Sequence, residues 1–147
     1  MFLADRLKRT IDDFSVFEDP QERLATLVDR ARKIPPLPSE ERVDANRVRG
    51  CVSVVWIQGE IREGDCYFRG DAESPLVRGL VVFLCDFFSG VPMAEVAGSD
   101  LEPLEALGLT HNLSPTRRAG LAAARQSIRI FARRAQGSRE NESRPLP

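Results

Sequence analysis

The segment from Leu76 to Ser89 constrains the fold more than any other, because it is apolar on almost every side at helical spacing. Only Arg78 and Asp86 interrupt it with charge, and Ser74-Pro75 precedes it as a cap and a first helical residue. A helix without a polar face must be covered by other elements on all sides. We therefore expect this helix at the centre of the protein.

Two strand candidates precede this helix, from Cys51 to Ile61 and from Cys66 to Asp71. The connection between them is Arg62-Glu63-Gly64-Asp65, a short turn that contains glycine. Such spacing is typical of an antiparallel hairpin.

Further helices are predicted where apolar residues recur every three or four positions between proline and glycine boundaries. They cover Phe2–Phe14, a segment from Asp19-Pro20 to Ile34, Leu101–Leu107, and a last segment from Ser114-Pro115 to Ala135. This order predicts an α+β fold, in which a small antiparallel sheet is packed against and flanked by N-terminal and C-terminal helices. We expect a single domain over residues 1–135 and a disordered tail over residues 136–147, where Ser, Arg, Glu and Pro dominate.

The balance of charge argues against a polyanionic partner. The 147 residues include 21 basic and 22 acidic side chains, so the net charge is -1. We therefore expect neither nucleic acid nor a membrane surface as a partner. No apolar run approaches the roughly 20 residues of a membrane span. The Met1 end carries charge at Asp5, Arg6, Lys8 and Arg9 and has no apolar signal-like run. These features predict a cytoplasmic protein, in which cysteines stay reduced.

The three cysteines are the first candidates for chemistry. Free cysteine is among the most buried residue types, so each is first interpreted as a small apolar residue of the core. Cys85 and Cys66 fit that interpretation, since aromatic residues surround both in the sequence. Cys51 differs because it follows Gly50, opens a strand candidate and has Arg47 and Arg49 close before it. Nearby positive charge stabilises the nucleophilic thiolate.

Other site types find little support in the sequence. The cysteines and the single His111 form neither a CxxC nor an HxxxH pair, so a metal site is not expected. No hydrolase motif and no glycine-rich phosphate loop is present.

The sequence also predicts the surroundings of four arginines on the last predicted helix. Arg117 falls in its first turn, where a positive charge opposes the helix dipole. We expect Arg117 to have a partner, with Asp71, Glu73 or a bound anion as candidates, although a solvated side chain is the competing interpretation. The residues Arg125, Arg129 and Arg133 are expected to form a solvated basic ridge on the face opposite the apolar one.

Several motifs in order resemble one known family. The stretch Asn46-Arg47-Val48-Arg49-Gly50-Cys51-Val52-Ser53-Val54-Val55-Trp56 is similar to the N-x-V-x-G-C-x-S-x-V-W signature of the SufE-type sulfur acceptors, also called Fe-S metabolism associated or cysteine desulfuration proteins. Later pieces match as well: Phe68-Arg69-Gly70-Asp71, Leu76-Val77-Arg78-Gly79-Leu80, Ser89-Gly90-Val91-Pro92, Leu107-Gly108-Leu109, Leu113-Ser114-Pro115-Thr116-Arg117 and Gly120-Leu121. The resemblance covers roughly Phe14 to Ala135 and implies the SufE/IscU-like fold.

The resemblance implies a sulfur shuttle rather than a free-standing enzyme. Cys51 would accept persulfide sulfur from a cysteine desulfurase of the SufS or CsdA type, stimulate that enzyme and pass the sulfur to an iron-sulfur scaffold of the SufB type. The chain itself would bind no cofactor, since the pyridoxal phosphate belongs to the desulfurase. Gly50, Glu73 and Arg117 stand at matching positions and would support the loop or the docking. Ala72 and Ala119 depart from the family pattern, where serine and a small polar residue are common.

Two alternatives from other functional classes stay open. One is an IscU-like scaffold or metal-binding protein that uses Cys51, Cys66 and His111 as ligands. The other is an interaction module in which the cysteine is incidental.

Overall fold

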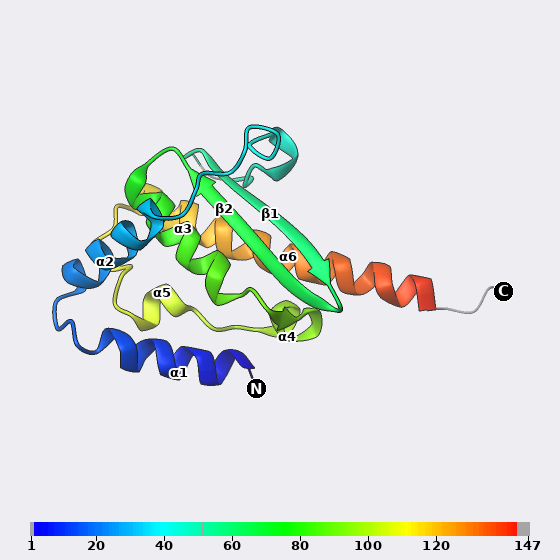
Figure 1. Ribbon diagram of the computed structural model, residues 1–147, viewed down its shortest axis with the longest axis horizontal. Coiled ribbons are helices and arrows are strands. Elements are labelled where there is room, and N and C mark those ends of the chain that lie inside the picture. Colours follow the sequence, from blue (N-terminus) through cyan, green and yellow to red (C-terminus); the bar gives the residue numbers. More distant parts are fainter. Residues whose placement is uncertain (1, 51, 144–147) are drawn as a thin grey trace.

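The computed structural model describes residues 2–50 and 52–143, and it has the α+β architecture that the sequence predicts. A three-stranded antiparallel sheet has the order β1-β2-β3, and helices cover it (Figure 1). The elements in chain order are α1 (Phe2–Phe14), α2 (Pro20–Arg32), a 3₁₀ turn (Asp44–Asn46), β1 (Val55–Arg62), β2 (Asp65–Ala72), α3 (Pro75–Phe87), β3 (Val91–Pro92), α4 (Met93–Gly98), α5 (Pro103–Ala106) and α6 (Pro115–Ser143). No helix in this described part of the chain is long and apolar enough to cross a membrane.

The predicted hairpin is confirmed. β1 pairs with β2 from Val55 opposite Ala72 to Arg62 opposite Asp65. Glu63 and Gly64 form the turn with φ angles of 53° and 86°, and positive φ at both central residues is what a type I′ hairpin turn requires.

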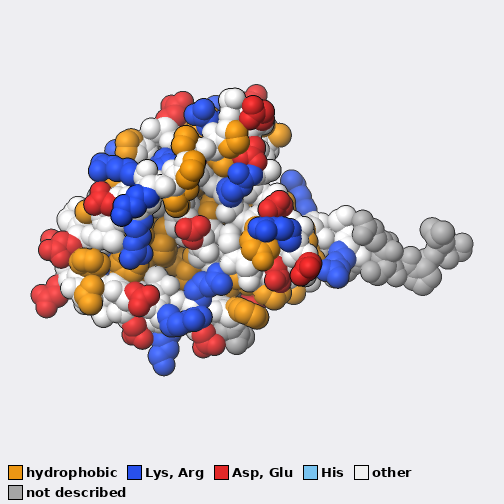
Figure 2. All heavy atoms as spheres, viewed as in Figure 1, with side chains coloured by type: hydrophobic (Ala, Val, Ile, Leu, Met, Phe, Trp, Pro, Cys, Tyr) orange, Lys and Arg blue, Asp and Glu red, His pale blue; other side chains and the backbone are white. Residues whose placement is uncertain are grey.

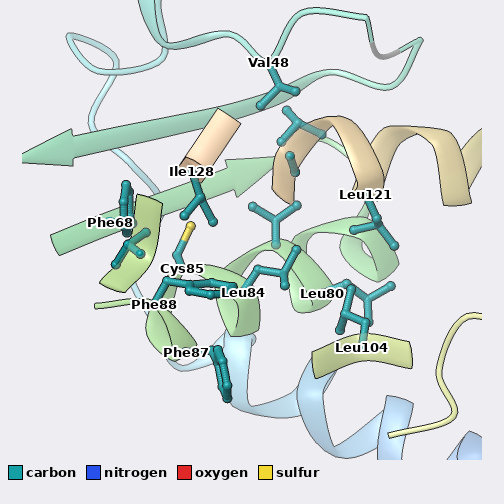
Figure 3. Close-up of a cluster of buried hydrophobic side chains, with 14 of the residues drawn as sticks. Val48, Phe68, Leu80, Leu84, Cys85, Phe87, Phe88, Leu104, Leu121 and Ile128 are labelled. Atoms are coloured by element: carbon teal, nitrogen blue, oxygen red, sulfur yellow. The ribbon is translucent and has the colours of Figure 1, made fainter. Parts of the chain in front are cut away.

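The apolar segment after the hairpin forms α3 and lies at the centre, as predicted. The Ser74 hydroxyl caps the helix by accepting a hydrogen bond from the Val77 amide. Leu80, Leu84 and Phe88 are almost completely buried, and Figure 3 shows them in one cluster with residues of β2 and α6. The helix packs against α2, β2 and α6, so it is covered on several sides.

A buried ion pair connects α2 and the segment after it to this centre. The Asp71 carboxylate at the end of β2 accepts hydrogen bonds from Arg78 Nε at 2.8 Å and from the Leu37 amide at 3.0 Å. The Arg78 guanidinium also donates to the carbonyls of Ala31 and Ile34. The end of α2, the proline-rich segment after it, β2 and α3 are therefore joined at one point.

The structure differs from the predicted elements in three places. β1 begins at Val55 rather than Cys51, because Val52 and Ser53 form a bend before the pairing with β2 starts. β3 and α4 were not predicted, since each is too short to show a clear periodicity. α6 continues beyond the expected end at Ala135 to Ser143, which is possible because no proline interrupts it and each added residue gains one backbone hydrogen bond.

The expected basic ridge on α6 is wrong for Arg125 and Arg129. Arg125 is 4 % exposed, lies 4.2 Å from the centre of the Phe88 ring and donates to the carbonyls of Ser99 and Leu101. Arg129 also donates to the Ser99 carbonyl. α4 packs on α6, and these two arginines satisfy the free carbonyls where α4 ends. Only Arg133 of the three is exposed, as predicted.

Candidate functional site

The family signature falls on a loop that is closed at the edge of the sheet. The Val48 amide donates to the Val55 carbonyl at 2.9 Å, and Arg47 forms an isolated antiparallel bridge with Trp56. The chain between these contacts, residues 49–54, is named the cysteine loop below. Cys51 belongs to it by sequence but lies outside the described residues.

The neighbours of Cys51 are accessible. Gly50 and Val52 are both exposed, and Val52 has 84 % of its surface open to solvent. Gly50 has a φ of +76°, which residues with a Cβ rarely adopt, although no atom lies within 4 Å of the position that a Cβ would take. The reason for glycine here is backbone conformation rather than lack of space.

Two arginines give the entrance of the cysteine loop a positive charge. Arg47 and Arg49 are exposed, and neither makes an ion pair with any residue that the structure describes. Unpaired cations within a few residues of a thiol favour its thiolate form.

The structure places Glu73 beside the end of the cysteine loop. Its backbone amide donates to the Val54 carbonyl at 3.2 Å, directly before β1 begins. The side chain of Glu73 is exposed and borders a hollow of about 390 Å³ with residues of α2 and with Arg78. Glu73 therefore anchors the loop through its backbone while its carboxylate faces solvent.

Within the described residues, no hydrogen bond or ion pair joins the Arg117 side chain to the cysteine loop. It lies in the first turn of α6, where Ser114 Oγ accepts from its amide, and it borders a cavity of about 200 Å³ with residues of α2 and of the α5–α6 connection. The predicted pairing with Asp71 is wrong, because Asp71 is buried and pairs with Arg78. Among the described residues Glu73 does not pair with Arg117 either.

The other two cysteines are buried thiols. Cys66 lies in β2 with no exposed surface, and burial together with the charge of Asp65 raises its pKa from 9.0 to about 11. Burial and the nearby Asp86 also raise the pKa of Cys85 far above its ordinary value. Figure 3 shows the Cys85 sulfur pointing toward Ile128 in the core. Both thiols stay protonated near neutral pH and are inaccessible to another protein.

The alternative ligand set of Cys51, Cys66 and His111 gains no support from these positions. Cys66 offers no accessible sulfur, whereas His111 is exposed between α5 and α6. Among the side chains that the structure describes, no three of His, Cys, Asp or Glu lie together as a metal site would need.

A large groove lies beside the cysteine loop and was not predicted from the sequence. It has a volume of about 730 Å³ and runs between the start of the loop, β1 and α6. Arg134 and Ile130 of α6 line it together with Arg47 and Arg49. The periodicity of the last helix indicated its buried side but gave no signal that β1 would stand beside its partly exposed side.

Comparisons with known proteins agree with this arrangement of motifs. The chain matches the SufE family, described as the Fe-S metabolism associated domain, over residues 8–132. The chain belongs to the SufE family.

Relatives from several organisms share about a third of their residues with this SufE family member. An uncharacterised SufE-like protein of Rhizobium etli is 34 % identical over 138 residues, which is 90 % of this chain and 93 % of the relative. The sulfur acceptor protein CsdE of Escherichia coli K12 is 34 % identical over 127 residues, which is 85 % of this chain and 84 % of the relative.

A solved structure confirms the fold. The solution structure of a hypothetical protein from Thermus thermophilus superposes with a TM-score of 0.72 and covers 90 % of this chain and 96 % of its own. The two sequences are 22 % identical, so this likeness concerns the fold alone.

Proposed function

We propose that this SufE family member is a sulfur acceptor that takes persulfide sulfur from a cysteine desulfurase onto Cys51. Membership of the family and the 34 % identity with a protein named as a sulfur acceptor support the assignment. The observation that carries it is the contrast among the three cysteines: Cys66 and Cys85 are buried with raised pKa values, whereas the residues on both sides of Cys51 are exposed.

The transfer is an exchange at sulfur without net oxidation. The Cys51 thiolate attacks the terminal sulfur of the donor's persulfide, and a new S–S bond forms between that atom and Cys51 Sγ. The S–S bond of the donor breaks, and the donor cysteine leaves as a thiolate. The terminal sulfur keeps its proton, so Cys51 then carries the persulfide. A second attack by an acceptor thiolate, on an iron-sulfur scaffold, regenerates Cys51 as a thiolate.

The surrounding residues fit this chemistry. Arg47 and Arg49 raise the thiolate fraction of a nearby thiol, and Gly50 supplies a backbone conformation that an L side chain would strain. Glu73 holds the end of the cysteine loop through its amide. Removal of the terminal sulfur from the donor also explains how the chain would stimulate the desulfurase, because a persulfide left on the donor blocks its next turnover. Arg117 is assigned to docking, since its side chain is exposed and borders a cavity that the described residues of the cysteine loop do not line.

The test is mass spectrometry of the intact chain after incubation with a cysteine desulfurase and cysteine. We expect a gain of one sulfur atom that maps to Cys51 and is removed by a reductant. Cys51→Ser should show no gain and no stimulation of the desulfurase. Cys66→Ala is the matched control, because it removes a buried thiol and should leave both the gain and the stimulation unchanged. A gain that persists in Cys51→Ser would refute the assignment.

A further inference from the structure

β1 has an open edge for most of its length. It is the outer strand of the sheet, and Val48 covers only its beginning by donating to the Val55 carbonyl. Backbone groups alternate in direction along a strand, so the groups that point to the same edge as those of Val55 belong to Ile57, Gly59 and Ile61. No segment of the described chain hydrogen-bonds to this edge at Gly59 or Ile61.

The groove of about 730 Å³ runs beside this open edge. Its apolar lining comes from Ile57 and Phe68 of the sheet and from Ile130 and Phe131 of α6. A Cβ placed on Gly59 would lie 2.8 Å from the Phe131 ring, so the helix approaches the strand closely at this point. The volume is in the range of ligand-binding clefts.

All charged side chains that line this groove within the described residues are arginines: Arg47, Arg49 and Arg134. None of the three forms an ion pair or a side-chain hydrogen bond with another described residue. The whole chain has a net charge of -1, and Figure 2 shows basic and acidic side chains interspersed over the face in view. A lining of one sign therefore selects for an occupant of the opposite sign.

The charge of the groove also argues against a second copy of the chain as occupant. Pairing of two β1 edges around a twofold axis would bring two sets of these three arginines together, and like charges in contact are unfavourable. An acidic occupant removes this repulsion.

We propose that the open edge of β1 binds an extended acidic segment of a partner protein as an added strand. Main-chain hydrogen bonds to Gly59 and Ile61 would hold the segment, as in other cases of strand addition at a sheet edge. Its apolar side chains would fill the groove over Phe131, and its carboxylates would pair with the arginines. The site uses no atom of Cys51, so strand addition can be tested independently of the sulfur transfer.

The first test measures binding of a short fluorescent peptide with a repeating Glu-Glu-Val-Val pattern, which places both residue types on each face of an extended strand. We expect it to bind the full chain, more weakly at high salt, and to protect the amide hydrogens of Gly59 and Ile61 from exchange. A peptide with alternate backbone amides methylated keeps the side chains but loses the donors, so it should not bind. A peptide with Lys in place of Glu should not bind either. Absence of binding by the Glu peptide, or equal binding by either control peptide, would overturn the proposal.

The second test changes the arginines. Arg47→Glu, Arg49→Glu and Arg134→Glu together should weaken peptide binding at least about tenfold, since each removes one attractive pair and adds repulsion. The control is Arg9→Glu, Arg118→Glu and Arg133→Glu, three exposed arginines outside the groove with the same change in net charge. Equal loss in both triple variants would mean that only net charge matters and would overturn the site. Concentration-dependent dimerisation of the unchanged chain through β1 would point to a second copy instead and would also overturn it. Cys51→Ala should bind the peptide as the unchanged chain does.

Discussion

Substitution of Asp71 by Asn is expected to destabilise the protein more than any other single change of charge described above. Asp71 Oδ2 accepts from the Leu37 amide, whereas Oδ1 accepts from the Ala72 amide and from Arg78 Nε. An asparagine has only one acceptor oxygen, so in either orientation its NH₂ group would face an N–H donor. The substitution also leaves the Arg78 guanidinium without its counterion in a site where both side chains are largely buried.

The expected loss follows from the burial of this pair. Breaking a buried ion pair by removing one partner costs about 3 to 5 kcal/mol, which includes the unsatisfied donors. The control is Asp29→Asn, because Asp29 also pairs with an arginine, Arg32, but the two side chains are 68 % and 70 % exposed. An exposed pair of this kind contributes about 0.3 to 0.5 kcal/mol.

Urea unfolding followed by circular dichroism measures both values. Asp71→Asn should lower the midpoint strongly with an unchanged slope, and Asp29→Asn should shift it little. In the Asp71→Asn variant, adding Arg78→Met should lower the free energy of unfolding less than Arg78→Met does in the unchanged chain. The reason is that Arg78 no longer has its counterion in that variant, so the second substitution removes an uncompensated charge. A loss below about 1 kcal/mol for Asp71→Asn, similar to that for Asp29→Asn, would refute the reasoning.

Three further predictions concern single positions in the core or packed against it. The pKa of Cys66 rises from 9.0 to about 11 on folding, so its thiol favours the folded state below pH 9 and this contribution is lost as the pH rises toward 11. Urea unfolding at a series of pH values should therefore show a smaller loss in the free energy of unfolding over that interval for Cys66→Ala than for the unchanged chain. Gly70→Ala should cost about 1 to 3 kcal/mol because a Cβ would lie 2.6 Å from a side chain of α3, whereas Gly98→Ala, with no atom within 4 Å, should not destabilise; equal thermal midpoints would contradict this. Arg125→Leu should lower the free energy of unfolding by about 1 to 3 kcal/mol, because the Leu101 carbonyl loses its side-chain donor and the Ser99 carbonyl keeps only Arg129. The exposed Arg133→Leu should change it by under about 0.5 kcal/mol.

Local signals in the sequence predicted most of the elements correctly. The cap at Ser74, the glycine turn at Gly64 and the apolar pattern of α3 each depend on residues close in the chain, and all three are confirmed. Asp19 likewise caps α2, where its carboxylate accepts from the Gln21 amide.

The errors arose where distant residues decide the local structure. Periodicity assigned Arg125 to solvent, but α4, which no periodic pattern revealed, packs over it and presents carbonyl oxygens to it. The valines around Ser53 favour a strand by composition, yet the contact from Val48 to Val55 closes a loop before β1 starts. The groove could not be predicted either, because it depends on how α6 and the edge of β1 stand side by side.

The contact between the Val48 amide and the Val55 carbonyl sets the length of a tether. Cys51 is three residues from Val48, and an extended chain spans at most about 3.3 to 3.6 Å per residue, so the backbone at Cys51 cannot move more than about 10 Å from this anchor while the contact holds. In the sulfur transfer proposed above, the partner must therefore bring its own sulfur to the end of the sheet. A partner whose sulfur lies deeper in its pocket must then dock closer to the sheet by a matching distance.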